Sequence, residues 1–221
     1  QDGNIESMAQ RVWRQLGEVG LQEQAVIATS KKQVDILKNQ LGRQVPIVVE
    51  PERRDTFPAI ALTAAYLSSV KRINPDEVVA VLPIDSYVDN DFYESVKDLE
   101  DTLNRSGGNI ALIGVKPDAP SSRFGYMIPK EKQRDHIQVS HFVEKPSETY
   151  AQALIKEEAL WNCGVFAFHL GFILSIIEQM GFPLDYADLL AQYEKLPKIS
   201  FDFEVVERTK DIVALPYEGV W

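Results

Sequence analysis

The segment VVAVLPIDSYVDND, residues 78–91, decides the fold class. Its apolar run at 78–82 is typical of a buried strand, Pro83 ends that strand, and Asp85 follows two residues later. Since a helix is expected at 91–103, the segment has the strand-then-helix order of an α/β unit. Ligands of open α/β sheets bind beyond the carboxyl ends of the strands, and Asp85 stands at such a position.

The same alternation continues on both sides of this segment. It predicts helices at 5–16, 31–41, 57–73, 91–103 and 147–155, three helical stretches after 169, and strands at 25–29, 45–49, 77–82, 109–115, 124–128, 137–143, 160–169 and 212–216. We therefore expect an α/β fold with a doubly wound, mostly parallel, Rossmann-like sheet and an antiparallel excursion after residue 115. The chain, 1–221, is expected to be a single domain truncated at both ends, because it starts almost directly in a helix and stops just after a strand.

Composition narrows the class of protein. The chain has 221 residues, of which 45% are hydrophobic, and a formal net charge of −10. An acidic surface repels nucleic acid and anionic membranes, so we expect neither as a partner, and small anionic ligands need local cations or a bound cation. The single cysteine, Cys163, excludes an internal disulfide, and the sequence shows no secretory leader or membrane-spanning run. We expect a cytoplasmic protein that acts on small molecules, and the sequence leaves a homodimer open.

Asp85 is the first candidate functional residue. Proteins bind Mg²⁺ with one or two carboxylates together with substrate phosphates and water, so a carboxylate at the mouth of a buried strand is suited to hold this ion. The alternative is that Asp85 belongs to a turn. Asp89, Asn90 or Asp91 is expected to cap the next helix.

The segment VVEPERRDTFPAIAL, residues 48–62, passes from a strand into a helix. Asp55 or Thr56 is expected to cap that helix, and a proline stands in its first turn. The free N–H groups of the turn can face an anion or the polar edge of a ring, and Arg53 and Arg54 add hydrogen-bond donors. The alternative is an ordinary capped helix with solvated arginines.

Two shorter motifs supply polar groups of the kind that bind a sugar phosphate. In HFVEKP, Lys145 at a strand end suits a phosphate as a point charge, and Glu144 can accept hydrogen bonds from sugar hydroxyls. In SRFGYM, Gly125 indicates a turn or a close approach, and Tyr126 can pack or contact a ligand. An exposed Glu–Lys pair is by itself typical of an ordinary protein surface.

The segment ALWNCGVFAF, residues 159–168, surrounds one amide with apolar residues. The amide of Asn162 needs its hydrogen bonds met, either by the backbone or by a polyhydroxyl ligand. Gly164 allows a ligand to approach the backbone closely. Cys163 is expected to be a small buried residue rather than a nucleophile, because no histidine or acid is paired with it in the sequence.

Five motifs, EPERRDTFPAIAL, VLPIDSYVDND, RFGYM, FVEKP and LWNCGVFAF, stand in the order and approximate spacing of the sugar-1-phosphate nucleotidylyltransferases. They resemble that family's EP-x-x-R-(N/D)-T-x-PAIA, LP-x-D, GYGYI, EKP and WN-(S/C)-G-x-F blocks. The branch that they resemble most is that of the mannose-1-phosphate guanylyltransferases. The segment SFDFEVVER, at 200–208, resembles the family's helix near the sugar site.

The resemblance implies nucleotidyl transfer from GTP to mannose 1-phosphate, which gives GDP-mannose and pyrophosphate with Mg²⁺ as cofactor. Such a reaction needs positioning and charge neutralisation more than covalent help from the protein. Carried over position by position, the resemblance makes Asp85 a Mg²⁺ ligand and a catalytic residue together with Lys145, which meets the sugar phosphate. It places Glu50, Arg54, Asp55 and Thr56 around the base and ribose, and Gly125, Tyr126, Glu144, Asn162 and Gly164 at the sugar, with Asp202 or Glu204 at the border of the sugar pocket.

The sequence also departs from the family pattern. The glycine-rich loop GG-x-G-x-RLWPLS, which binds the triphosphate in the family, is not in this sequence, and Ser86 stands where guanylyltransferases commonly have histidine. The family's second metal-binding aspartate follows the final tryptophan in a W-x-D-x-G pattern, whereas this chain ends at Trp221. We therefore expect the 221-residue chain to be inactive by itself. Another base, another sugar 1-phosphate, or a catalytically dead homologue that binds nucleotide or sugar to regulate a partner all stay open.

Overall fold

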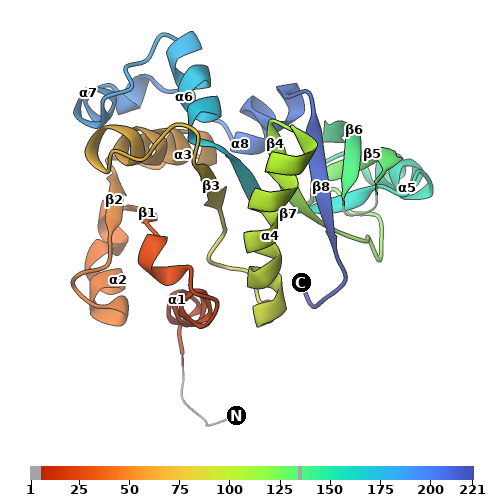
Figure 1. Ribbon diagram of the computed structural model, residues 1–221, viewed down its shortest axis with the longest axis horizontal. Helices are drawn as coiled ribbons and strands as arrows, with labels where there is room; N and C mark the ends of the chain where they lie inside the picture. Colours follow the sequence, from red (N-terminus) through yellow and green to blue (C-terminus); the bar gives the residue numbers. More distant parts are fainter. Residues whose placement is uncertain (1–5, 134–135) are drawn as a thin grey trace.

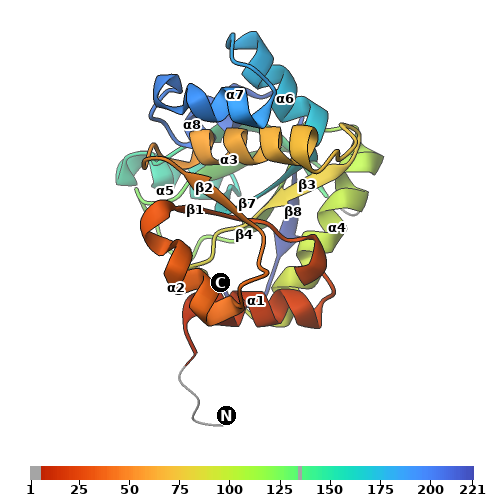
Figure 2. The same cartoon turned by 90° about the vertical axis from the view of Figure 1, so that its left-hand side faces the viewer.

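The computed structural model of the protein describes residues 6–133 and 136–221, and Figure 1 shows its strands between an upper and a lower group of helices. The helices are α1 (Met8–Glu18), α2 (Val34–Leu41), α3 (Thr56–Ala65), α4 (Asn90–Ser106), α5 (Glu148–Lys156), α6 (Leu170–Gln179), α7 (Tyr186–Ala191) and α8 (Phe201–Glu204). The strands are β1 (Ile27–Ser30), β2 (Ile47–Glu50), β3 (Val78–Val81), β4 (Ile110–Val115), β5 (Tyr126–Lys132), β6 (Ile137–Val143), β7 (Leu160–His169) and β8 (Ile212–Tyr217). Figure 2, turned by 90°, keeps α3, α6 and α7 on one side of the strands and α1 and α2 on the other, with α4 at the right-hand edge.

The strands form two sheets. A six-stranded sheet has the order β3-β7-β4-β8-β6-β5, with β5 also paired to β7, and a separate two-stranded sheet joins β1 to β2 in parallel. In the larger sheet β4 and β8 are parallel neighbours, whereas β7 runs antiparallel to β3, β4 and β5, and β6 runs antiparallel to β5 and β8. It follows that β3, β4, β5 and β8 point in one direction and β6 and β7 in the other.

The predicted α/β fold class is confirmed, and the antiparallel excursion predicted after residue 115 contains β5, β6 and β7. The prediction of a mostly parallel sheet holds for strand direction, but the hydrogen-bonded neighbours in the large sheet are mainly antiparallel. The reason is that β7 inserts between β3 and β4, and β6 between β8 and β5, and each inserted strand runs opposite to its two neighbours. The expectation of a single domain stays a prediction.

Strand β7 separates two apolar clusters. Its side chains Phe166 and Phe168 belong to the cluster under α3, α6 and α8, and there both rings pack on Phe201. The alternate side chains Val165 and Ala167 belong to the cluster under α1 and α4. Because successive side chains of a strand point to opposite faces, the continuous apolar run of β7 indicates a strand that is buried on both sides.

Most predicted elements are present at close to their predicted bounds. The helix predicted at 5–16 is α1, which begins after a capping box formed by Ser7 and Gln10, and residue 5 lies outside the described residues. The helix predicted at 57–73 is α3 followed by a π-helical turn at Tyr66–Val70, so the regular α-helix is shorter than predicted. Within the described ranges, no helix combines the length and the apolar character needed to cross a bilayer.

The two sheets do not pair with each other. Among the described strands, β1 bonds only to β2 and β3 bonds only to β7, so each keeps one free edge. Helix α3 packs on β1 and β2 and also on α6, which belongs to the layer above the large sheet. The helical layers therefore hold the two sheets together, and residues of both β1 and β3 line a cavity between the sheets.

Candidate active site

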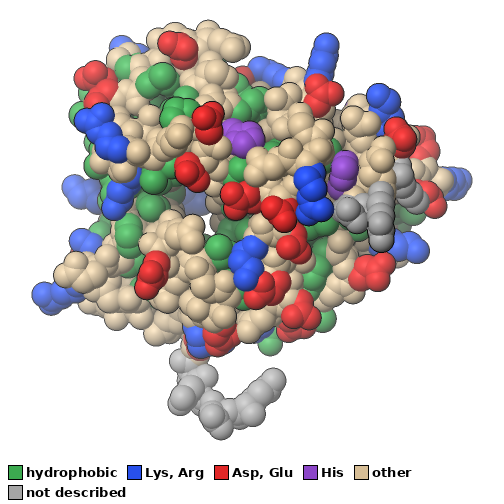
Figure 3. Space-filling model, in the orientation of Figure 1, with side chains coloured by type: hydrophobic (Ala, Val, Ile, Leu, Met, Phe, Trp, Pro, Cys, Tyr) green, Lys and Arg blue, Asp and Glu red, His purple; other side chains and the backbone are tan. Residues whose placement is uncertain are grey.

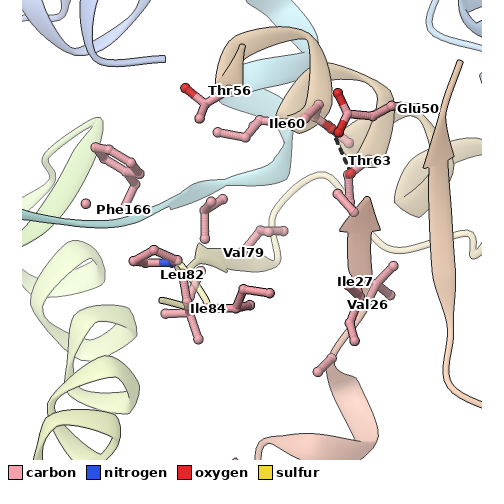
Figure 4. A pocket seen from close by; sticks show the side chains of 18 of the residues that line it. Val26, Ile27, Glu50, Thr56, Ile60, Thr63, Val79, Leu82, Ile84 and Phe166 are labelled. Atoms are coloured by element: carbon pink, nitrogen blue, oxygen red, sulfur yellow. Dashed lines mark hydrogen bonds between the residues drawn. The ribbon is translucent and has the colours of Figure 1, made fainter. Parts of the chain in front are cut away.

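A cavity of about 1020 Å³ lies between the two sheets, and we call it the inter-sheet cavity. Figure 4 shows its apolar walls, with Val26 and Ile27 at β1 on one side and Val79, Leu82 and Ile84 at and after β3 on the other. Its polar rim comes mainly from the loop between β2 and α3, and the polar lining residues are Gln24, Glu50, Arg53, Arg54, Asp55, Thr56, Thr63, Lys198 and Asp202. The structure therefore brings together all four residues that the sequence assigns to a base and ribose.

The loop between β2 and α3 has a strained residue at its end. Asp55 is the N-cap of α3, as predicted, and its carboxylate accepts a hydrogen bond from Thr56 N at 2.8 Å. Its backbone has φ 73° and ψ −174°, a conformation that is costly for a residue with a side chain. Two N–H groups that the sequence predicts to face an anion are used internally, since Thr56 N bonds to Asp55 and Phe57 N bonds to the Ile199 carbonyl at 3.2 Å.

Glu50 and Arg54 are both held by residues from the other end of the chain. The Tyr193 hydroxyl donates to Glu50 Oε2 at 2.6 Å, and Arg54 Nε donates to the Leu196 carbonyl at 3.0 Å. The Arg54 guanidinium also pairs with Glu52. Part of the donor set of Arg54 is therefore engaged inside the protein, although the residue still lines the cavity.

A second cavity of about 490 Å³ lies beyond the end of β3, and we call it the Asp85 cavity. Asp85 is exposed at its rim and has no hydrogen bond or ion pair with any described residue, so its carboxylate is open to a ligand. The cavity is also lined by most of the residues that the sequence assigns to a sugar: Gly125, Glu144, Asn162, Gly164 and Asp202. The two cavities share Pro83, Gly164 and Asp202, so they are neighbours.

Glu144 is a buried carboxylate with one unsatisfied oxygen. Its Oε1 pairs with Lys145 Nζ at 2.8 Å, whereas Oε2 is buried and has no hydrogen-bond partner among the described residues. A Cβ on Gly125 would lie 2.5 Å from Glu144 Oε2 and 2.3 Å from Phe142 Cζ, so only glycine leaves room for this carboxylate. An unpaired buried acceptor is costly and indicates a place for a ligand hydroxyl.

Asn162 is anchored at both ends of its amide. Its Nδ2 donates to Asp202 Oδ1 at 2.8 Å, and its Oδ1 accepts a hydrogen bond from Gly164 N at 2.9 Å. Of the two uses left open for this amide, the structure shows the bond to the backbone, and the second N–H of Nδ2 is left over for a ligand. Burial raises the pKa of Asp202 to about 6, and the negative charge of Glu144 adds to the rise.

Lys145 stands at the edge of the Asp85 cavity. Its ammonium group is bound to Glu144, and this hydrogen bond raises the pKa of Lys145, so the side chain stays charged. Lys145 is exposed and does not line either cavity in the described structure. Its predicted contact with a sugar phosphate therefore requires the side chain to turn from Glu144 toward the cavity, and it stays a prediction.

Local cations offset the acidic character of the molecule at both cavities. Figure 3 shows acidic side chains spread over the face that α4 covers, in line with the net charge of −10. The inter-sheet cavity has Arg53, Arg54 and Lys198 in its lining, and the Asp85 cavity has Arg123. Such cations are what a small anionic ligand needs near an acidic surface.

The metal prediction rests on a single carboxylate. In the part of the chain that the structure describes, no group of three or more His, Cys, Asp or Glu side chains could hold a metal. A Mg²⁺ ion that takes phosphate oxygens and water as its other ligands needs only one or two carboxylates. Asp85 fits that requirement because it lines the cavity without a partner among the described residues.

The placement of Tyr126 corrects one predicted sugar contact. Tyr126 is fully buried, and its hydroxyl accepts a hydrogen bond from Ser121 N at 2.9 Å and donates to the Ser121 carbonyl at 3.1 Å. It lines neither cavity, because its ring points into the core from β5 and supports the loop before Gly125. Cys163 is buried as predicted, and burial raises the pKa of its thiol, which disfavours the nucleophilic thiolate.

Sequence reasoning missed two residues of the site region, Tyr193 and Lys198. Tyr193 contacts Glu50 from 143 positions away, and Lys198 joins the lining of the inter-sheet cavity. The surrounding sequence YEKLPKIS contains a tyrosine and a lysine among helix and turn residues, which indicates nothing about a ligand. Only the long-range packing of 193–202 against the loop after β2 reveals them.

Comparison with known proteins gives a family and several relatives. The family described as nucleotidyl transferase matches residues 2–194. The mannose-1-phosphate guanylyltransferase of Escherichia coli (strain K12) is 31% identical over 206 residues, which cover 79% of this chain and 41% of the relative. The protein XanB of Xanthomonas campestris, described as a xanthan biosynthesis protein, is 28% identical over 237 residues, which cover 97% of this chain and 50% of the relative. The chain thus spans half or less of the length of these relatives.

Solved structures confirm the likeness in fold. A structure from Thermus thermophilus, described as mannose-1-phosphate geranyltransferase, has a TM-score of 0.82 and 24% sequence identity and covers 98% of this chain and 65% of the other. A structure from Helicobacter pylori, described as mannose-6-phosphate isomerase, has a TM-score of 0.76 and 19% identity and covers 97% and 89%. At these identities the likeness concerns the fold alone.

Proposed function

Because the chain belongs to the nucleotidyl transferase family, we propose that it binds GTP and mannose 1-phosphate in the two neighbouring cavities and serves the transfer that gives GDP-mannose and pyrophosphate. Relatives at 28–31% identity named as mannose-1-phosphate guanylyltransferases support the choice of base and sugar. Because the chain covers only 41% of such a relative, its substrates and its reaction are both part of the proposal.

One observation carries the proposal: the inter-sheet cavity and the Asp85 cavity are adjacent and share Pro83, Gly164 and Asp202. The first has the size and the polar rim to take a nucleoside, and the second has several hydrogen-bonding groups of the kind that bind a sugar. A transfer reaction between two substrates requires that both be held next to each other, and adjacency of this kind converts a bimolecular step into an effectively unimolecular one.

On the nucleotide side, the carboxylate of Glu50 and the side chain of Thr56 offer polar contacts to a base and ribose, and the apolar walls at Val79 and Ile60 cover the ring faces. Arg53, which is exposed at the rim, and Lys198 supply positive charge for the phosphates. The acceptor character of Glu50 favours a ring edge with N–H groups, which guanine has.

On the sugar side, the free Glu144 Oε2 and the remaining Asn162 N–H face hydroxyl groups, and Gly125 keeps the carboxylate in reach. Glu144 accepts hydrogen bonds from the sugar, while Lys145 gives up its contact with Glu144 and meets the phosphate of the sugar. A Mg²⁺ ion held by Asp85 would neutralise the negative charge of the phosphates.

The reaction needs no covalent intermediate with the protein. A phosphate oxygen of mannose 1-phosphate attacks the α-phosphorus of GTP, the bond from that phosphorus to the bridging oxygen breaks, and pyrophosphate leaves with the electron pair. The chain's own residues hold both phosphates in line and lower their mutual repulsion through positive charge.

The test is calorimetry of the protein with GTP, ATP, UTP and dTTP, each with and without Mg²⁺. We expect GTP to bind most tightly and Mg²⁺ to strengthen its binding. The variant Asp85→Asn should lose the gain from Mg²⁺, which corresponds to about a tenfold weaker Kd in the presence of the ion. The matched control is Asp89→Asn, an exposed aspartate four residues further on, whose side chain makes no capping bond and lines neither cavity.

Two results would count against the proposal. If none of the four nucleotides binds, the nucleotide-binding role is wrong. If the gain from Mg²⁺ is the same in Asp85→Asn and in the wild type, Asp85 does not hold the ion. A preference for another nucleotide would keep the nucleotide site and replace guanine by the base that binds.

A further inference from the structure

Tyr193 makes a long-range contact with the base side of the site. It lies in a 3₁₀ turn, Tyr193–Lys195, is 1% exposed, and donates its hydroxyl proton to Glu50 Oε2 at 2.6 Å. Among the described residues, Tyr193 is the only one whose side chain donates a hydrogen bond to this carboxylate, and Glu50 lines the inter-sheet cavity. Burial and the Glu50 carboxylate both raise the pKa of Tyr193, so its hydroxyl stays a proton donor.

Three more hydrogen bonds tie the segment that begins at Tyr193 to the loop after β2. Besides the bond from Arg54 to the Leu196 carbonyl, Phe57 N donates to the Ile199 carbonyl at 3.2 Å, and Phe201 N donates to Thr56 Oγ1 at 2.8 Å. The segment is itself fixed in the core, because Leu196 and Phe201 are buried. We call residues 193–202 the clamp segment.

The clamp segment explains how the strained loop keeps its shape. Asp55 has φ 73° and ψ −174°, which persists only when the surrounding structure holds it. The clamp bonds lie on both sides of Asp55, from Glu50 and Arg54 before it to Thr56 and Phe57 after it. The orientation of the Glu50 carboxylate is thus set by Tyr193 and not by β2 alone.

A carboxylate held in one orientation selects among nucleobases. Guanine presents two adjacent donors, N1–H and the 2-amino group, which match the two oxygens of one carboxylate, whereas hypoxanthine lacks the 2-amino group. We propose that Tyr193 is a positioning residue that holds Glu50 so that the site distinguishes guanine from hypoxanthine. This inference rests on the proposed function. Tyr193 does not touch the base and acts through Glu50.

The experiment compares the Kd of GTP with that of inosine triphosphate by calorimetry at pH 7. We expect the wild type to prefer GTP by about tenfold, since a hydrogen bond to a charged group contributes that much or more. In Tyr193→Phe the GTP/ITP preference should fall to about threefold or less, because the carboxylate can rotate. A merely structural role would weaken both nucleotides by the same factor and leave their ratio unchanged.

Matched variants make the result specific. Tyr186→Phe removes a hydroxyl from the nearby helix α7 that makes no side-chain hydrogen bond with a described residue, and it should keep the wild-type ratio. Glu50→Asp keeps the charge but withdraws the carboxylate by one methylene, so it should lose the preference even if Tyr193→Phe proves too unstable to assay. Thermal unfolding of each variant shows whether it is folded at the assay temperature.

The outcomes separate this inference from the proposed function. If the wild type binds both nucleotides equally, or if Tyr193→Phe and Glu50→Asp keep the full GTP/ITP preference, the positioning role is overturned while the nucleotide site stands. If the wild type binds neither nucleotide, the proposed function is wrong, and the inference that rests on it is wrong as well.

Discussion

At the scale of single residues, the Asp85 cavity depends on a chain of contacts between side chains that are far apart in the sequence. Gly125 leaves space for the Glu144 carboxylate, burial and then the charge of Glu144 raise the pKa of Asp202, and Asp202 accepts a hydrogen bond from Asn162. Glu144 and Asp202 repel each other when both are charged, and the positive charge of Lys145 offsets part of this repulsion. The protonation of Asp202 is therefore a measurable property of the protein without ligands.

The raised pKa of Asp202 predicts a specific dependence of stability on pH. Its ordinary value is near 3.8 and its value in the folded protein is about 6. Between these values the folded state keeps a proton that the unfolded state has lost, so the free energy of unfolding contributed by this group falls as pH rises from about 4 to about 6. Asp202→Asn removes this titration and can still accept the bond from Asn162.

We therefore expect Asp202→Asn to gain stability relative to the wild type as pH rises from 4 to 7, by on the order of 1–2 kcal/mol after allowance for its partial exposure. Urea unfolding at pH 4, 5, 6 and 7 measures this difference. The control Asp98→Asn, on the exposed side of α4, should show no such trend. A constant difference between Asp202→Asn and the wild type at all four pH values would show that the folded-state pKa of Asp202 is not raised.

At the scale of elements, helix α8 connects the two cavities. Phe201 N, at its start, bonds to Thr56 in the lining of the inter-sheet cavity, and the next residue, Asp202, bonds to Asn162 in the lining of the Asp85 cavity. Both bonds come from neighbouring residues of one short helix that is fixed by the packing of Phe201 on Phe166 and Phe168. Ligands bound in the two cavities would therefore contact residues that are joined through this one helix.

This connection predicts coupled binding. We expect saturating mannose 1-phosphate to tighten GTP binding several-fold, within the usual range of such couplings. In Thr56→Val, which keeps the shape of the side chain and removes the acceptor of Phe201 N, the factor should approach one. Calorimetric titration of GTP with and without the sugar phosphate gives the factor.

Thr102→Val is the control for this coupling. It also removes a hydroxyl that bonds within the protein, but on α4 and away from both cavities, so its coupling factor should match the wild type. The role of α8 is wrong if Thr56→Val shows the same coupling factor as Thr102→Val.

The elements themselves could largely be predicted from the sequence. Strands β6 and β7 have the predicted bounds, because their apolar and β-branched residues form long runs with clear ends. The helix predicted at 57–73 is longer than the α-helix that forms, because the apolar pattern continues through the π-helical turn at Tyr66–Val70. That pattern gives no sign of the change in backbone hydrogen bonding. The direction of side chains is harder to predict: the sequence allows Tyr126 either to pack or to contact a ligand, and only the structure shows that it is buried in the core.

Contacts between distant segments could not be predicted. Asp85 and the residues of the β2–α3 loop follow strand ends, and a general rule for α/β sheets brings such positions together. Tyr193 has no such rule, since a hydrogen bond over 143 positions depends on how the clamp segment packs in the finished fold. The sequence therefore predicts which groups belong to the site better than it predicts which groups hold them.

At the scale of the whole molecule, the site exists because two sheets stop short of each other. The small sheet supplies β2 and the loop with Glu50, the large sheet supplies β3 and β7, and the inter-sheet cavity lies between the free edges of β1 and β3. The insertion of β7 between β3 and β4 places Asn162 and Gly164 beside the segment that follows β3, which carries Asp85. The arrangement positions the inter-sheet cavity and the Asp85 cavity side by side on an acidic molecule that has positive groups at their rims.

The most direct test of this account is a competition titration with GDP-mannose, a molecule that contains both the guanine nucleotide and the sugar that the two cavities are proposed to bind. The account predicts that one GDP-mannose binds per chain and that GTP alone and mannose 1-phosphate alone each displace it, because each competes for one of the two adjoining cavities. Binding of GDP-mannose that neither compound displaces, or an absence of binding at millimolar concentration, would contradict it.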